Sequence, residues 1–101
     1  DFNVCMLYYK MEEYQAAITS FEDFLRENPT TTHREEIIKY MVLTYAHYAE
    51  NSVFEKQRER YELALEKYNT LTYMYPESKY IAELEPVVEK IRVELTNIKT
   101  K

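Results

Sequence analysis

The sequence contains no glycine and no tryptophan, and its 101 residues include only three prolines and one cysteine. Tight β-hairpin turns depend on glycine, so its absence argues against a strand-rich fold. Phosphate-binding loops need glycine as well, which removes one common basis for an enzyme. The single cysteine, Cys5, allows neither an internal disulfide nor a thiolate metal cage.

Long apolar runs and basic clusters are also missing. No apolar stretch approaches the ~20 residues that span a bilayer, and no basic segment with an apolar core opens the chain. Thirteen Lys and Arg are scattered among 18 Asp and Glu, for a net charge of −5, so nucleic acid is a poor partner. With 46% hydrophobic and 31% charged residues, the chain can bury a core and keep a solvated face. We expect one folded domain over residues 1–101, as part of a longer protein.

Apolar residues recur at three- and four-residue intervals, which predicts an all-α fold of about five helices. The expected helices run from the start to about Met11, from about Glu13 to Glu27, from Thr32 until Asn51-Ser52 interrupts the run, from Ser52 to about Tyr75, and from about Ser78 to Ile98. In the first helix, the expected apolar stripe is Val4, Cys5, Tyr8 and Met11. Thr32 with Glu35, and Ser52 with Glu55, have the spacing of capping boxes. Pro86 removes one backbone hydrogen bond, so we expect a kink or a break near it.

Two segments that end in proline repeat each other. Tyr14, Ala17, Phe21 and Pro29 recur at identical intervals as Tyr61, Ala64, Tyr68 and Pro76. This spacing resembles the second helix of a tetratricopeptide repeat, in which a small residue lets two helices approach, an aromatic fills the gap and a proline turns the chain. Ala17 and Ala64 should therefore be buried at helix crossings, and Cys5 takes the small position of a first helix.

The two repeat prolines are 47 residues apart, whereas the standard period is about 34. The extra residues fall at 49–60, which predicts a long hairpin with protruding ends. We therefore predict stacked antiparallel helical hairpins, a tetratricopeptide-like α-solenoid with an extended second hairpin. Its expected parts are repeat one at 1–29, extended repeat two at 32–76 and a C-terminal capping helix at 78–98.

Three segments are more specific than the generic repeat: Tyr-Ala-His-Tyr-Ala-Glu-Asn-Ser at 45–52, Glu-Arg-Tyr at 59–61 and Tyr-Pro-Glu-Ser-Lys-Tyr at 75–80. They resemble the last repeats of the BamD family, the tetratricopeptide lipoproteins of the outer-membrane β-barrel assembly machinery, in its Bacteroidetes-like form. The resemblance covers about residues 8–95. It implies a domain on the periplasmic side of the outer membrane, tethered by a lipidated cysteine upstream of this sequence rather than by Cys5. It also implies docking to the periplasmic domains of the barrel-forming subunit and to accessory lipoproteins.

No set of residues points to catalysis. A nucleophile with its base, a phosphate-cradling loop and a convergent set of ligands are all missing. His33 and His47 are fourteen positions apart without a second ligand at three or four residues, so surface or rim positions explain them better than a metal site. We expect no enzymatic activity, no cofactor and no metal.

Tyrosines and arginines are the candidate partner-binding residues. Of the eleven tyrosines, the apolar stripes account for Tyr8, Tyr14, Tyr45, Tyr61, Tyr68 and Tyr75. The mixed charge run at 55–60 is either a solvated helix face or a docking site at the protruding hairpin end. Aromatic and arginine side chains are enriched at interface hot spots. The candidate set is therefore Tyr9, Tyr40, Tyr48, Arg58, Arg60, Tyr73 and Tyr80.

The leading hypothesis is a protein-binding scaffold of outer-membrane protein assembly. The alternative is a generic peptide-binding adaptor or chaperone co-factor of the same fold. Such adaptors hold a peptide carboxylate with a carpet of lysine and asparagine, whereas here the first helix offers only Asn3 and Lys10, and the third only Lys39. An enzyme would need residues outside this sequence.

Overall fold

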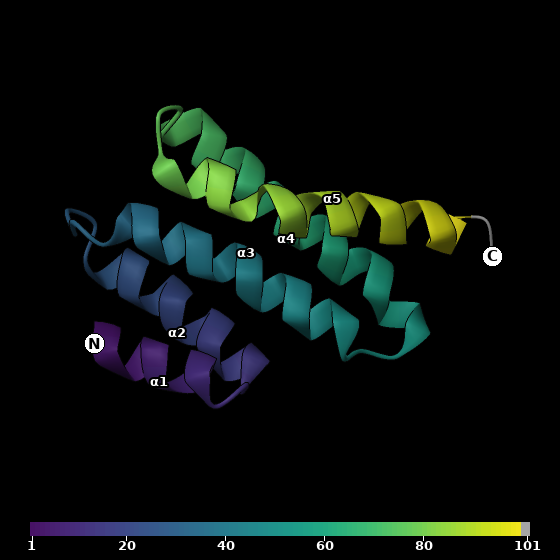
Figure 1. The fold of residues 1–101 in the computed structure, drawn as a ribbon. Coiled ribbons are helices and arrows are strands. Elements are labelled where there is room, and N and C mark those ends of the chain that lie inside the picture. The colour runs from purple at the N-terminus through teal and green to yellow at the C-terminus, as the bar shows by residue number, and fades with distance from the viewer. Residues whose placement is uncertain (100–101) are drawn as a thin grey trace.

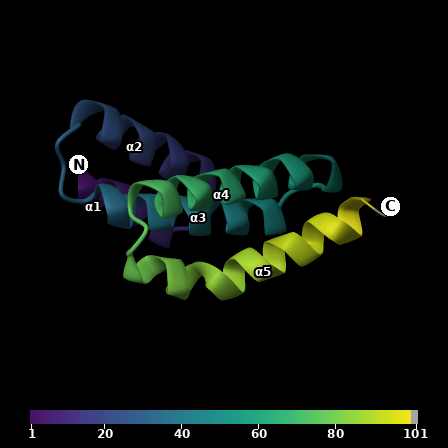
Figure 2. The same ribbon diagram turned by 90° about the horizontal axis from the view of Figure 1, so that it is seen from above.

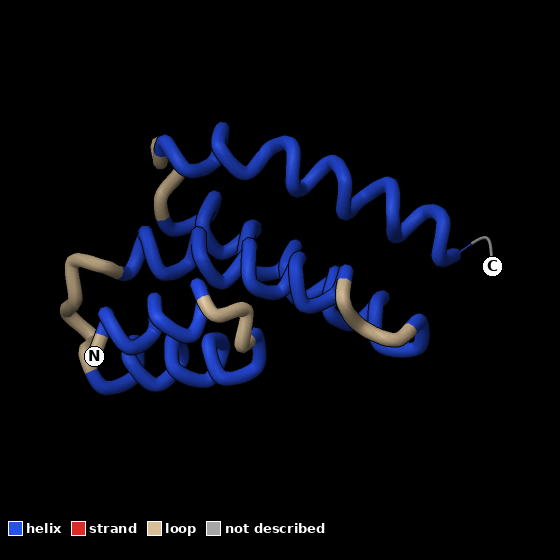
Figure 3. The backbone as a smooth tube through the Cα atoms, turned by 60° about the horizontal axis from the view of Figure 1, so that its bottom comes forward, coloured by secondary structure: helices blue, strands red, loops and turns tan. Residues whose placement is uncertain are grey.

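The computed structural model describes residues 1–99, which form five helices joined by short loops (Figure 1). The helices are α1 (Phe2–Lys10), α2 (Tyr14–Glu27), α3 (Arg34–Glu50), α4 (Phe54–Met74) and α5 (Lys79–Lys99). Within these residues there is no strand, and the prediction of an all-α fold of helical hairpins is confirmed. The loops lie at alternate ends of the stack, so consecutive helices run antiparallel (Figure 3).

The helices form two layers. Seen from above, α2 and α4 lie on one side of the molecule, α5 lies on the other, and α3 runs between them (Figure 2). The side away from α2 and α4 is formed by α1, α3 and α5 and faces the viewer in Figure 1. It is called the α1/α3/α5 face below. This arrangement brings residues of three separate helices onto one surface.

The core consists of three clusters of buried side chains. One joins α1, α2 and α3 around Cys5 and Phe21, and two join α3, α4 and α5, one of which also includes Ile18 of α2. Ala17 and Ala64 are 0% exposed, so their predicted burial is confirmed. Because neither alanine reaches beyond its Cβ, the helix backbones can approach closely at both positions.

The α3–α4 hairpin is longer than the α1–α2 hairpin. Helix α3 has 17 residues and α4 has 21, against 9 and 14 in the first hairpin. The extra residues lengthen the two helices, and the α3–α4 turn projects past α1 and α2 (Figure 1). On one side, the projecting end is packed against α5, where Ile98 shares a cluster with Ala49 and Tyr61.

Both predicted capping boxes are wrong. Helix α3 begins after His33, and α4 begins after Val53, and neither start has a side-chain cap. The hydroxyl of Ser52 instead donates a hydrogen bond back to the carbonyl of Tyr48. Serine commonly bonds the carbonyl four residues earlier, and here that bond ties Ser52 to the end of α3 rather than to the start of α4.

The predicted stripe of α1 is also wrong, except at Cys5. Cys5 is 1% exposed, but Val4, Tyr8 and Met11 are 42%, 37% and 57% exposed. The helix buries the neighbouring side, with Met6 and Tyr9 packed against the α1–α2–α3 cluster. The repeat pattern marks residues that a neighbouring helix would cover, and in the described part of the chain nothing covers that side of α1.

Glu12, two residues after the end of α1, adopts the left-handed region, with φ of 59°. Its N–H donates to the carbonyl of Tyr9 at 3.1 Å, and the Glu13 N–H donates to Tyr8 at 3.0 Å. These two bonds define a Schellman motif, which usually places glycine at the Glu12 position. The chain has no glycine to mark this turn, and glutamate accepts the strained conformation instead.

Pro86 lies inside α5 without interrupting it, so the alternative of a break is wrong. Pro86 is exposed, and α5 changes direction along its length in Figure 2, as expected of a helix that contains proline. Of the helices in residues 1–99, none combines the length and the hydropathy needed to cross a membrane.

Candidate protein-binding surfaces

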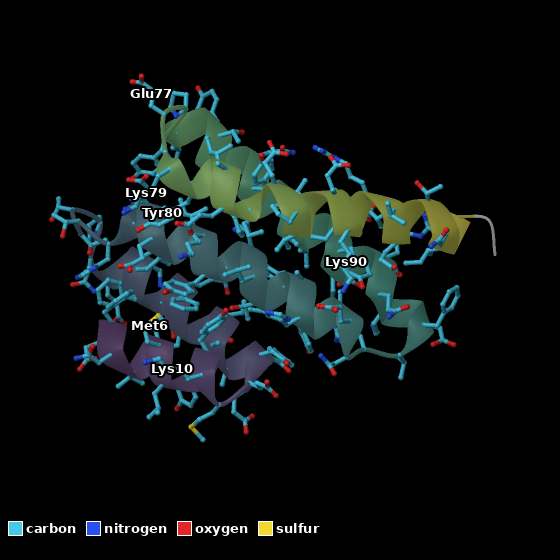
Figure 4. All side chains as sticks on the ribbon, viewed as in Figure 1. Met6, Lys10, Glu77, Lys79, Tyr80 and Lys90 are labelled. Carbon is cyan, nitrogen blue, oxygen red and sulfur yellow. The ribbon has the colours of Figure 1, made fainter. Side chains whose placement is uncertain are left out.

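A row of side chains on the α1/α3/α5 face links three of the predicted site residues. The rings of Tyr9 and Tyr40 meet edge to face, with centroids 5.0 Å apart. The Lys39 ammonium lies 4.9 Å from the Tyr40 centroid and 4.7 Å from that of Tyr80. Tyr80 lies at the start of α5, beside α3 (Figure 4). The structure therefore joins Tyr9, Tyr40 and Tyr80 into one row through a lysine that the sequence had not indicated.

The charge of Lys39 is satisfied within the protein. Its Nζ lies 3.1 Å from Oε2 of Glu83, and its side chain is 19% exposed. Burial alone would lower the pKa of Lys39, but the hydrogen bond to Glu83 and the neighbouring Tyr40 raise it above its ordinary value. Burial also raises the pKa of Tyr9, with a smaller effect from Tyr40. The row is thus fixed in place and presents tyrosine rings rather than an unpaired ammonium.

A second cluster braces the projecting hairpin end. The guanidinium carbon of Arg60 lies 3.8 Å from the ring centroid of Tyr48, and Nη1 of Arg60 donates to the Ser52 hydroxyl at 2.6 Å. Gln57 adds a hydrogen bond to the carbonyl of Ala49 at 3.2 Å. Two predicted site residues, Tyr48 and Arg60, are therefore in direct contact, with the guanidinium held from two sides.

Arg58 points away from this cluster. Residues two apart on a helix lie about 200° apart, so Arg58 and Arg60 leave opposite sides of α4. Arg58 is partly exposed, and within residues 1–99 its guanidinium makes no hydrogen bond or ion pair. The two arginines cannot belong to one small patch.

Tyr73 is separate from both groups. Its side chain is 87% exposed on α4, in a groove that Leu95 of α5 also lines. The structure thus divides the predicted residues into the row of Tyr9, Tyr40 and Tyr80, the pair of Tyr48 and Arg60, and the isolated Arg58 and Tyr73. Their role in partner binding stays a prediction.

The sequence did not indicate an ion-pair cluster between α3 and α5. Glu50 lies 3.0 Å from Nζ of Lys90 and 3.3 Å from Nδ1 of His47 (Figure 4 labels Lys90). These side chains border a cavity of about 200 Å³ over Tyr61 and Ile91. Glu50 and Lys90 are 40 positions apart, so only the packing of α5 on α3 could reveal the pair.

The two histidines and the acidic residues do not gather into a metal-binding cluster in the described residues. No group of three or more His, Cys, Asp or Glu side chains among them is placed to hold a metal ion. His33 stacks on Phe2, with centroids 4.3 Å apart, and pairs with Glu36. His47 lies between Glu50 and the ring of Tyr14.

Comparison with known proteins gives a family match. The model of the family YfiO, described as outer membrane lipoprotein, matches residues 2–100. No curated protein sequence matches the chain. The family match spans all three groups of candidate residues and both helical hairpins.

Proposed function

The chain belongs to the YfiO family of outer membrane lipoproteins, and from this premise we propose that it is a protein-binding scaffold of the outer-membrane β-barrel assembly machinery. The match confirms the resemblance to BamD-like tetratricopeptide proteins. In this proposal the domain lies on the periplasmic side of the membrane and docks the periplasmic domains of the barrel-forming subunit and accessory lipoproteins. A lipid anchor outside this sequence holds it there. The proposal includes no enzymatic activity and no cofactor.

The braced hairpin end carries this proposal. Arg60 is stacked on Tyr48 and bonded to Ser52, so its guanidinium is ordered before any partner arrives. An ordered side chain loses less conformational entropy on binding than a mobile one. Tyrosine and arginine are also the residues most enriched among binding hot spots. The projecting end is therefore suited to be a docking point.

Partner capture tests the proposal. The intact protein should co-purify with the periplasmic domains of the barrel-forming subunit, and Tyr48→Ala with Arg60→Ala should weaken that affinity roughly thirtyfold, as expected for an anchor worth ~2 kcal/mol. Arg26→Ala, at an exposed arginine paired with Asp23, is the control. Unchanged affinity would move the docking point away from the hairpin end. No capture by the intact protein would overturn the scaffold role.

The peptide-binding adaptor is the second candidate because the row on the α1/α3/α5 face brings tyrosine rings of three helices together around one lysine. However, the lysine at its centre is already paired with Glu83 at 3.1 Å. A peptide carboxylate would have to displace that carboxylate. Binding of a short peptide with a free carboxyl end, lost in the amidated peptide, would favour the adaptor over the scaffold.

A further inference from the structure

A groove runs along the outer side of α4 beside α5. It has a volume of about 830 Å³ and is lined by Glu62, Leu65, Glu66, Asn69, Thr70, Tyr73, Met74 and Leu95. Tyr73 is 87% exposed, and Met74 is 46% exposed. An unburied tyrosine and methionine, side by side along one groove, form a small apolar surface that no described part of the chain covers.

The lining residues follow one stripe of α4. Glu62, Glu66, Asn69 and Tyr73 recur at intervals of four, three and four, so they lie above one another on the helix. The stripe extends for about three turns, or ~16 Å at 1.5 Å per residue. Side chains at this spacing form a ridge, and a second helix lying alongside can pack its own side chains into the groove next to that ridge. The shape fits a helix of about three turns.

The negative charge of the groove indicates that the partner helix carries basic residues. Two carboxylates, Glu62 and Glu66, line it, and no basic side chain does. Arg58 lies one turn beyond Glu62, at the end of the stripe. On α5, Glu89 is already paired with Arg92 at 3.0 Å, so this ion pair adds no net charge. A partner helix would place lysine or arginine opposite the two glutamates, at a typical interface with an apolar centre and a polar rim.

We infer that the α4 groove binds an amphipathic helix of a partner protein, whose apolar stripe covers Tyr73, Met74 and Leu65 and whose flanking Lys or Arg pairs with Glu62 and Glu66. The inference rests on the proposed scaffold role for the class of ligand, but it concerns a surface other than the Tyr48–Arg60 hairpin end. In this mode an amphipathic helix lies with its apolar face in a hydrophobic groove.

The test uses the intact chain and a fluorescent 18-residue helix made of leucine and lysine, with leucine at three- and four-residue intervals. A peptide of the same composition in scrambled order, and one with glutamate in place of lysine, are the comparison probes. The stripe peptide should bind at least tenfold more tightly than either. Equal binding of the scrambled peptide would mean that only net charge is read, and would overturn the inference.

Two variants locate the binding. Tyr73→Ala should weaken binding of the stripe peptide about tenfold, and Glu62→Gln with Glu66→Gln should weaken it and reduce its salt dependence. The matched controls are Val93→Ala, at an apolar residue 56% exposed outside the groove lining, and Glu22→Gln with Glu27→Gln on α2. Equal losses in the controls would overturn the groove as the site. Capture of the barrel-forming subunit is tested at Tyr48 and Arg60, whereas peptide binding is tested at Tyr73, Glu62 and Glu66. Either experiment can therefore fail while the other succeeds.

Discussion

The guanidinium of Arg60 lies over the ring of Tyr48 at 3.8 Å from the ring centroid and also donates to Ser52 at 2.6 Å. The residues that it joins sit at the end of α3 and in the second turn of α4. Arginine over an aromatic face gains about 0.5–2 kcal/mol depending on its desolvation. The contact therefore stabilises the projecting end of the hairpin and orients the guanidinium of Arg60.

Arg60→Ala should lower the free energy of unfolding by about 0.5–2 kcal/mol, because both the stacking on Tyr48 and the bond to Ser52 are lost. Chemical denaturation followed by helical circular dichroism measures the change. Arg58→Ala, which removes the same side chain from a position without a hydrogen bond or ion pair in the described residues, is the control. Equal loss in both variants would show that the stack contributes nothing.

Ala64→Phe should destabilise the fold by ~1–3 kcal/mol, because a ring cannot enter a crossing where the alanine is 0% exposed. Thermal unfolding measures the effect. Ala82→Phe, at an exposed alanine of α5, controls for the lower helix propensity of phenylalanine. A melting temperature of Ala64→Phe that equals that of Ala82→Phe would contradict the close crossing.

Some features of this fold could be predicted from the sequence, and others could not, depending on the pattern that was used. The paired motif around Ala17 and Ala64 predicted which helix faces are buried, because a small residue at a fixed interval has one physical use. The same logic failed at Tyr8, since a repeat motif marks a contact even where no neighbour supplies it. Ser52 failed as a cap, because capping spacing alone does not decide whether its hydroxyl bonds forward or back.

The sequence predicted the types of residue in the candidate sites but not how these residues are grouped in space. Tyr9, Tyr40 and Tyr80 stood out because no core stripe accounted for them, but their common row depends on how α1, α3 and α5 pack. Lys39, which joins the row, stands out in the sequence only as the single lysine of the third expected helix, too little for a carboxylate-binding carpet. Contacts between helices far apart in sequence carry no local signature.

Glu12→Gly should stabilise the protein by about 1 kcal/mol. Glutamate holds φ of 59° at this position, where an L-residue pays ~1–2 kcal/mol that glycine avoids, less the greater entropy that glycine loses on folding. Thermal unfolding at two pH values separates the backbone effect from the loss of a carboxylate. As a control for the charge, Glu12→Gln should leave stability nearly unchanged. A stability gain of Glu12→Gln equal to that of Glu12→Gly would refute the strain.

Cys5 should react slowly with a thiol reagent in the native protein and rapidly in denaturant. Its side chain is 1% exposed, and its Sγ lies 3.2 Å from the hydroxyl of Ser20. A buried thiol reacts only when its surroundings open, so the labelling rate reports the opening of α1 from α2. Fast labelling without denaturant would show that α1 is frayed. If partner binding lowered the labelling rate of Cys5 further, the partner would contact the α1–α2 hairpin.

Tyr61 should make the fold sensitive to alkali. Burial raises the pKa of Tyr61 above the ordinary value of 10.0, and Glu94 and Glu50 raise it further. Between the unfolded and folded pKa values, the folded state binds the proton that the unfolded state has lost, so the free energy of unfolding falls as pH rises above about 10. One such group contributes a slope of at most about 1.4 kcal/mol per pH unit.

Urea titrations at several pH values from 8 to 11 would measure this slope in the intact chain and in Tyr61→Phe. The variant should lose part of the alkaline decline, because phenylalanine cannot ionise in the 3% exposed site. Tyr73→Phe, the same substitution at a residue that is 87% exposed, is the matched control. Since burial also raises the pKa of Tyr45 and Tyr68, a residual slope is expected in Tyr61→Phe. Equal slopes in the two variants would place the alkaline sensitivity outside the core around Tyr61.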